Sequence, residues 1–567
     1  MASIQRRLIH GRPYYYLVES RRVNGKPRPV VLKYLGKADD LLRRLEQTEP
    51  QRPIAALTRE FGASATLWSL AGELGLVDLI NAHAPKRQQG ASVGQYMTLA
   101  AINRCVSPTS KRTFQDWYAS TALPRLSGVA HKALTPQRFC DHMDYLDEPR
   151  IRGIEAELSH RIVERFDVDL RCLTFDCTNF DTFIDTRNPA ELPQRGHAKS
   201  KRRDLRVVGL ALMVSTDFHV PLFSQVYRGN QPDSKTFASV SEELAERHRV
   251  LARDVEHITL VFDKGNNSED NLVGLADGPF HVIGSLVPSQ HQGLLDIPSS
   301  KFKVLDDPRL KGVTAYRIRA EVYGREWTLV VTRSEELLQG QMRGIQQHLA
   351  KKVKALAELQ VRVRRQQEGR RRGGRPYTRE ALQKQADKLA QGQYLREVLR
   401  VQVEATNGKL RLTYRTDRGA LARLKRRELG KRILFTDNHE WSTEDIVLGY
   451  RNQHHVEAAF RQMKDPHFVS WSPMFHWTDS RIRVHAFYCV LALTLAALLQ
   501  RRAAQAGIRL TADDIIDQLA GIEEIHNLYP PTGGGAGRPR AEVTSSRRNR
   551  VQDRLWRALN LEPLAAV

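Results

Sequence analysis

Hydrophobic and polar positions along the chain follow two different periods. Apolar residues recur at helical spacing across residues 54–165, for example from Leu67 to Leu76. Short apolar runs that are typical of strands precede this part, at residues 14–19 and 30–35, on either side of Asn24-Gly25. The pattern predicts a small basic β-hairpin unit with a following helix in residues 1–50, and a helical domain over residues 54–165.

After residue 170 the apolar runs shorten and indicate strands. We predict strands at residues 171–175, 205–215, 220–227, 258–262 and 280–286, with helices over 236–249 and from residue 268. Three strands, a helix, a strand, a helix and a strand are typical of an α/β layer fold with a mixed sheet. Residues 170–286 are therefore expected to form the first part of such a core.

The rest of the chain is less regular until a late pair of helices. Residues 287–441 combine short strands with a highly charged helical stretch, and we interpret them as an insertion. Residues 442–505 predict the final core helices, with Ser442 or Thr443 as the cap of a helix that ends at Lys464. Residues 506–567 are expected to be a tail, with a flexible basic segment at 531–550.

Composition and charge restrict the partners and the compartment. Lys and Arg number 88 and Asp and Glu 64, which gives a formal net charge of +24 and favours a polyanionic partner. Five scattered cysteines argue against a disulfide framework. The apolar run at 484–499 is shorter than the roughly 20 residues that span a bilayer, so a buried core helix, no membrane and a cytoplasmic location are expected.

Three carboxylates stand where a hard metal ion would need them. Asp176 and Asp263 each follow a predicted apolar strand, and Glu457 lies on the late helix. A carboxylate at the end of a buried strand is costly unless it is paired or metal-bound. Carboxylate oxygens suit Mg²⁺ or Mn²⁺, and two such ions about 3.5–4 Å apart serve phosphoryl transfer. Taken singly, either aspartate is more simply a turn residue or a helix cap, and Glu457 a solvated helix residue.

Tyr450, Glu457 and Lys464 are spaced by seven residues. In one continuous helix this spacing returns to nearly the same face, with about 20° of drift. A carboxylate for metal, with a lysine and a tyrosine hydroxyl for phosphate oxygens, would form one functional stripe. Lys464 alone could instead pair with the end of the helix dipole.

These motifs resemble a known family. FDCTNF around Asp176, VFDKGNNSEDNL around Asp263 and YRNQHHVEAAFRQMKD around Glu457 resemble bacterial insertion-sequence transposases of the DDE type, in the branch marked by Tyr-x2-Arg-x3-Glu-x6-Lys. The amino-terminal YYYLVESRRVNGKPR and the downstream PMFHWTDSRIRVHAFYCVLAL are similar to the subgroup numbered sixteen thirty-four. The resemblance covers nearly the whole chain.

The resemblance implies an RNase H-like mixed-sheet core with a large insertion before the last catalytic helix. It implies that Asp176, Asp263 and Glu457 form the catalytic triad and bind two Mg²⁺ or Mn²⁺ ions. Tyr450 and Lys464 match motif positions that contact DNA phosphates, and Lys264 keeps a cation where arginine is common. The motif's arginine position holds Gln453, so that role is not transferred.

The implied activity is metal-dependent cleavage of DNA at element ends followed by strand transfer into target DNA. The partners would be double-stranded DNA, as element ends and as target, and a second subunit in a dimeric synaptic complex. Residues 54–165 would bind the ends, and the protein would be bacterial and nucleoid-associated. Two alternatives stay open: an RNase H-like nuclease without strand transfer, and a non-catalytic basic DNA-binding protein.

Overall fold

A computed structural model of the chain describes residues 2–23, 26–46, 52–85, 90–232, 235–236, 243, 247, 258–263, 280–369, 376–406, 408–530 and 538–566. The predicted helix from residue 268, the Asn24-Gly25 turn and Lys264 lie outside these residues. Of the predicted helix over 236–249, residues 236, 243 and 247 are described, and all three are helical.

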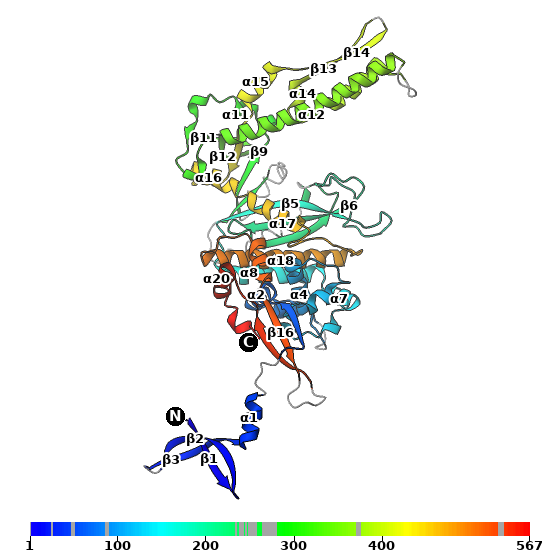
Figure 1. Cartoon of the computed structure of the whole chain (residues 1–567). Coiled ribbons are helices and arrows are strands. Elements are labelled where there is room, and N and C mark those ends of the chain that lie inside the picture. The colour runs from blue at the N-terminus through cyan, green and yellow to red at the C-terminus, as the bar shows by residue number, and fades with distance from the viewer. Residues whose placement is uncertain are drawn as a thin grey trace.

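One nine-stranded mixed sheet organises the middle of the molecule (Figure 1). Its strand order is β10-β11-β12-β15-β9-β8-β5-β6-β7, in which β5, β8 and β9 are parallel and all other neighbours are antiparallel. The core strands are β5 (Cys172–Thr182), β6 (Arg206–Ser215), β7 (Pro221–Arg228), β8 (Ile258–Phe262) and β9 (Phe280–Leu286). The mixed α/β fold expected from the sequence is confirmed, and the bounds of β8 and β9 agree with the predicted runs.

The sheet continues into the part that we interpreted as an insertion. Its further strands are β10 (Lys303–Val304), β11 (Val313–Val322), β12 (Arg325–Ser334) and β15 (Lys431–Thr436). They pair onward from β9 through β15, and both faces of β12 are buried. The expected separation at residue 287 is therefore corrected, because these strands belong to the core sheet. Strand periodicity reveals a strand but not its partner.

A projecting arm leaves the sheet after β12 and returns at β15. It consists of α12 (Glu335–Gln367), α13 (Arg379–Ala390), α14 (Leu395–Val398), β13 (Leu399–Thr406), β14 (Lys409–Thr416) and α15 (Arg418–Arg427). Two small hydrophobic clusters lie wholly within it, one built around Leu356 and Leu382 and one around Leu338 and Leu424. The arm thus has its own core and is the true insertion.

The helical part begins with a strand rather than a helix. It comprises β4 (Ala55–Glu60), α2 (Gly62–Glu73), α3 (Leu76–His83), α4 (Val93–Val106), α5 (Phe114–Ala119), α6 (Leu123–Ser127), α7 (Pro136–Met143) and α8 (Glu148–Phe166). Helix α18 (Asp479–Gln505) packs against α4, α2 and α8 and also against β7. This helix joins the helical part to the sheet.

The described carboxyl-terminal residues are not a tail. They form α19 (Ala512–Ala520), β16 (Glu523–Tyr529), β17 (Arg540–Ser545) and α20 (Arg550–Ala558), and β16 pairs with both β17 and β4. The expected flexible segment at 531–550 is corrected for residues 538–550, while 531–537 lie outside the described residues. Polar, glycine-rich composition hid a strand whose partners are far away in the sequence.

The amino-terminal unit has one strand more than predicted. Strands β1 (Ala2–Ile9), β2 (Arg12–Val23) and β3 (Lys26–Gly36) form an antiparallel sheet, followed by α1 (Ala38–Glu46). In Figure 1 this unit stands apart from the rest of the chain. Tyr14, Tyr16 and Tyr34 form its aromatic cluster, with ring centroids 5.1–6.1 Å apart.

Helix α18 is long and apolar enough to cross a membrane by length and composition, but 94% of its most apolar window is buried within the protein. Every residue from Val484 to Leu499 is buried, as the sequence predicts for a core helix. Helices α2 and α3, which are bent by 57° at their junction, pass the same test only if they are counted as one span.

Candidate active site

The two aspartates occupy matching positions on two neighbouring parallel strands, Asp176 within β5 and Asp263 directly after β8. Thr174 pairs with Val261 and Phe175 with Phe262, so the register places Asp176 opposite Asp263. Residues that pair across adjacent strands project from the same face, and such strands are about 5 Å apart. The register therefore places these two residues next to each other on the sheet.

Strand β5 does not end before Asp176. It continues to Thr182, because residues 176–182 stay paired with β6. Asp176 is half-buried inside the strand, whereas Asp263 comes directly after β8, also half-buried. The prediction that the strand ends at residue 175 is corrected. Residues 176–182 are too polar to be recognised as a strand from the sequence, and they form one because they pair with β6.

The predicted single helix from Thr443 to Lys464 is two helices. Helix α16 (Thr443–Arg451) and helix α17 (His454–Lys464) are joined at Asn452 and Gln453, whose backbone stays in the right-handed helical region. There the amide groups of Asn452 and Gln453 bond three residues back, to the carbonyl oxygens of Gly449 and Tyr450. The amide of Asn452 also bonds four residues back, to the carbonyl oxygen of Leu448. The chain therefore stays helical through the junction, and Tyr450 and Glu457 line the same pocket.

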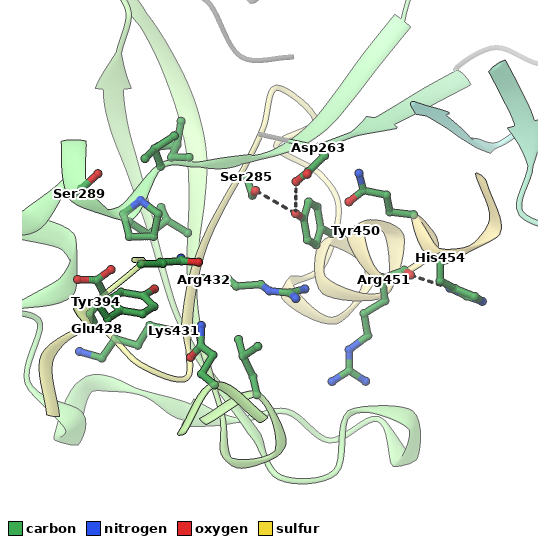
Figure 2. Close-up of a pocket in the computed structure, with 18 of the residues that line it drawn as sticks. Asp263, Ser285, Ser289, Tyr394, Glu428, Lys431, Arg432, Tyr450, Arg451 and His454 are labelled. Carbon is green, nitrogen blue, oxygen red and sulfur yellow. Dashed lines mark hydrogen bonds between the residues drawn. The ribbon is translucent and has the colours of Figure 1, made fainter. Parts of the chain in front are cut away.

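Tyr450 points toward the aspartate and not outward. Its hydroxyl lies 3.3 Å from Asp263 Oδ1 and 2.9 Å from Ser285 Oγ (Figure 2). Its ring packs in a cluster with Val261 and Ile283, on the face that α16 covers. Burial, and then the negative charge of Asp263, raise the pKa of Tyr450 to about 12. The tyrosine is therefore neutral and donates to the aspartate.

Asp263 and Glu457 line one pocket of about 510 Å³ (Figure 2). Basic side chains of β15 and α16 share it, namely Lys431, Arg432 and Arg451. The arm provides the opposite wall, which includes Tyr394 and Glu428. Helix α17 reaches the site by packing its buried residues Val456, Ala459, Phe460 and Met463 inward, and the helix lies against β5 and β6.

Lys464 lies beside the first aspartate. Its Nζ donates to Thr178 Oγ1 at 2.6 Å and sits 5.6 Å from the centre of the Phe180 ring. Partial loss of solvent, and then the neighbouring cation Lys199, lower the pKa of Lys464, while Asp176 acts in the opposite direction. Lys199 also donates to the carbonyl of Cys177. Two cations thus lie next to Asp176.

The predicted triad is only partly assembled. Asp176 and Asp263 are neighbours by register, and Asp263 and Glu457 share the pocket, which Asp176 does not line. Within the part of the chain that the structure describes, no three His, Cys, Asp or Glu side chains are grouped closely enough to hold a metal ion. The carboxylate oxygens of these three residues are ligands that suit a hard cation, and Asp176 and Asp263 form the centre of the candidate site.

Sequence reasoning missed several residues of the site. Ser285 sits inside a predicted apolar strand, and only the sheet order brings it to Tyr450. Lys199 belongs to the basic run RGHAKSKRRD, and the sequence gives its charge. The sequence gives no sign that this run folds back so that Lys199 contacts the Cys177 carbonyl on β5. Arg432 could be found only once β15 was placed beside β9.

One family model matches the amino-terminal part of the chain. Residues 4–65 match the model of the IS1634 family transposase N-terminal domain, in agreement with the resemblance of the amino-terminal motif. No curated protein matches the chain.

Two solved structures are similar to the chain. A piggyBac transposase in a synaptic complex with hairpin DNA is 8% identical, with a TM-score of 0.38 and 82% of each chain covered. The Mos1 transposase in a paired-end complex with its left transposon end is 13% identical, with a TM-score of 0.14, covering 35% of this chain and 60% of that one.

Proposed function

We propose that this protein is a DNA transposase of the DDE type with an RNase H-like core. Asp176, Asp263 and Glu457 would hold two Mg²⁺ or Mn²⁺ ions. The observation that carries the proposal is the strand order β7-β6-β5-β8-β9. In it, Asp176 lies on the first core strand and Asp263 directly follows the fourth, with their positions in register. This is the arrangement that the family resemblance implies for the first two acids.

Bound metal would activate the attacking oxygen and neutralise charge on the scissile phosphate. The protein's own side chains do the rest. Tyr450 and Ser285 hold Asp263 in one orientation, which is how groups behind a metal ligand ordinarily act. Lys464 and Lys199 place positive charge beside Asp176, where a phosphate would lie.

The proposal revises the role of Tyr450. Because its hydroxyl is buried between Asp263 and Ser285, we assign it to positioning and not to phosphate contact. Lys464 stays a proposed phosphate contact, since its side chain is exposed next to β5. Lys264 stays a prediction outside the described residues.

The test is a cleavage assay on DNA that carries the inverted repeats flanking the gene. Asp176→Asn, Asp263→Asn and Glu457→Gln should each abolish cleavage while DNA affinity is retained. They should also reduce the rise in melting temperature on adding Mn²⁺, which is a readout independent of activity. Asp181→Asn is the matched control, because Asp181 is a carboxylate of the same strand that accepts a 2.9 Å bond from Ser200.

The outcomes separate the candidate functions. Cleavage that survives Glu457→Gln contradicts the triad. Cleavage without joining of a pre-cut 3′ end to target DNA favours the nuclease without strand transfer. Binding without cleavage at any divalent metal concentration favours the non-catalytic DNA-binding protein.

A further inference from the structure

A second pocket, of about 490 Å³, opens where the helical part meets the segment between α17 and α18. Its walls come from the loop after α4, from α7, from that segment and from the start of α18. The volume falls in the range of small-molecule sites, about 300–1,000 Å³. No described residue lines both this pocket and the pocket that Asp263 and Glu457 share, so the two are separate sites.

The charge of this second pocket is positive. Lys111, Arg112 and Arg481 line it, and none of its described lining residues is acidic. Asp144 neutralises Arg481 from outside the pocket through two bonds of 2.8 and 2.7 Å. A negatively charged ligand would therefore meet two further cations, Lys111 and Arg112, whose charge no carboxylate of the pocket offsets.

Lys111 gives independent evidence that the pocket takes an anion. Its Nζ is buried and has no hydrogen-bond acceptor within the described part of the chain. The ring centres of Phe139 and Tyr488 lie 4.0 and 4.4 Å from Nζ and offset part of its charge, but a ring face offers no acceptor atom to three N–H donors. A buried donor without an acceptor is costly, and an anion in the pocket would supply one. Burial, and then the charge of Arg104, lower the pKa of Lys111, and an anion would act in the opposite direction.

The lining also includes two large and exposed aromatic side chains. Phe475 and Trp477 are 65% and 67% exposed, although aromatic side chains of this size are normally mostly buried. Tyr488 adds a third ring to the lining. The pocket therefore combines ring surfaces for a flat group with donors for a negative charge.

We propose that this pocket binds a free small molecule in which a flat ring carries a phosphate group. Phe475 and Trp477 contact the ring, and Lys111 and Arg112 receive the phosphate. A phosphate dianion suits these two cations, and a guanidinium can form two parallel bonds to phosphate oxygens. The inference goes beyond the proposed function and does not depend on it, because the pocket shares no described residue with the candidate active site.

A cysteine of the same pocket allows binding to be measured. Cys140 lines the pocket and is half-buried, whereas Cys172 is half-buried elsewhere and serves as the reference. The full chain is alkylated with iodoacetamide at increasing concentrations of phenyl phosphate, and mass spectrometry follows both cysteines. Phenyl phosphate should slow alkylation of Cys140 severalfold by covering it, and should leave Cys172 unchanged. Inorganic phosphate and phenol, each of which keeps one half of this probe, should need roughly tenfold higher concentrations.

Two substitutions assign the two halves of the ligand. Lys111→Met removes the ammonium group and keeps an unbranched stem, so it should weaken protection by phenyl phosphate roughly tenfold while the melting temperature stays the same or rises. Trp477→Ala should weaken protection by phenyl phosphate and leave the weaker protection by inorganic phosphate unchanged. Lys311→Met is the matched control, because Lys311 is exposed and does not line the pocket.

Three results would overturn the inference. The first is alkylation of Cys140 that phenyl phosphate does not slow, and the second is protection that survives Lys111→Met undiminished. The third is protection of Cys140 by a DNA duplex but not by phenyl phosphate, which would make the pocket part of a nucleic-acid surface. A loss of cleavage in the assay of the proposed function concerns the active site alone, because the phenyl phosphate titration contains neither DNA nor metal.

Discussion

Tyr450→Phe is the substitution that best tests how the site is organised. It removes one hydroxyl and keeps the ring, which packs with Val261 and Ile283. The hydroxyl lies within hydrogen-bond distance of both Asp263 Oδ1 and Ser285 Oγ. Phenylalanine breaks both links at once and takes one partner away from Ser285, a residue that is only 5% exposed.

The size of the effect follows from the two distances. At 3.3 Å the bond to Asp263 is longer than the 2.5–3.0 Å usual between oxygens, so it contributes about 1 kcal/mol despite the charge. The 2.9 Å bond to Ser285 contributes about as much. We expect the free energy of unfolding to fall by about 1–2 kcal/mol. Loss of an orienting bond to a metal ligand should weaken metal affinity by roughly tenfold.

Two titrations check this reasoning. The Mn²⁺ concentration that gives half-maximal cleavage should rise about tenfold, while the Kd for DNA measured without metal should stay within twofold. Tyr394→Phe is the matched control, because it removes the same group from the arm wall of the same pocket. If the Kd for DNA rises and the metal titration does not move, Tyr450 contacts phosphate after all and its positioning role is refuted.

Three further predictions concern other parts of the chain. Burial raises the pKa of Glu60 to about 7. The contribution of its protonated carboxyl to the free energy of unfolding is therefore fully present below pH 4.5 and falls by about 3 kcal/mol as the pH rises to 7. Thermal melts of Glu60→Gln at different pH values should lack this fall in stability. Lys464→Ala should weaken DNA binding equally for all DNA sequences. The slope of the logarithm of the DNA-binding constant against the logarithm of the salt concentration should become shallower by about one, and an unchanged slope would contradict a phosphate contact. Replacing residues 335–429 with a two-residue turn should leave the core sheet intact, because Ser334 N donates to Gly430 O at 2.8 Å and the two ends of the arm are therefore already adjacent. Circular dichroism should show an unchanged strand signal. Loss of cooperative melting would show instead that the arm supports the core.

The sequence predicts the buried strands well and the polar ones poorly. Residues 258–262 and 280–286 are apolar runs between polar ones, and their strands have the predicted bounds. Residues 176–182 alternate less clearly, and they form a strand only because β6 offers a partner. The local pattern of apolar residues shows when both faces of a strand are buried. Pairing with a strand that is distant in the sequence leaves no such local pattern.

The candidate site shows the same division. Strand-end carboxylates and a late helix predict that Asp263 and Glu457 approach each other, and they share a pocket. The spacing by sevens puts Tyr450 and Glu457 on one helix face, and both line the pocket. It does not show that the Tyr450 hydroxyl turns to Asp263, or that Lys464 lies beside Thr178 and outside that pocket. Neither Ser285 nor Lys199 could be inferred, because each reaches the site through contacts across more than twenty residues or between strands.

The position of Glu457 depends on the helical part of the chain as much as on the sheet. Helix α17 follows α16, which is packed on the sheet, and it runs into the segment that carries Trp471. Arg104 of helix α4, only 1% exposed, holds that segment by donating to the carbonyl oxygen of Ser472 at 2.9 Å, and its other terminal nitrogen donates to Thr109 O at the same distance. A buried guanidinium whose two terminal nitrogens both donate to backbone carbonyls is a rigid link, because breaking those bonds leaves a charge away from water without partners. The carboxylate on α17 is therefore fixed from both ends, and a DNA segment that shifts the helical part would also shift Glu457 relative to Asp176 and Asp263.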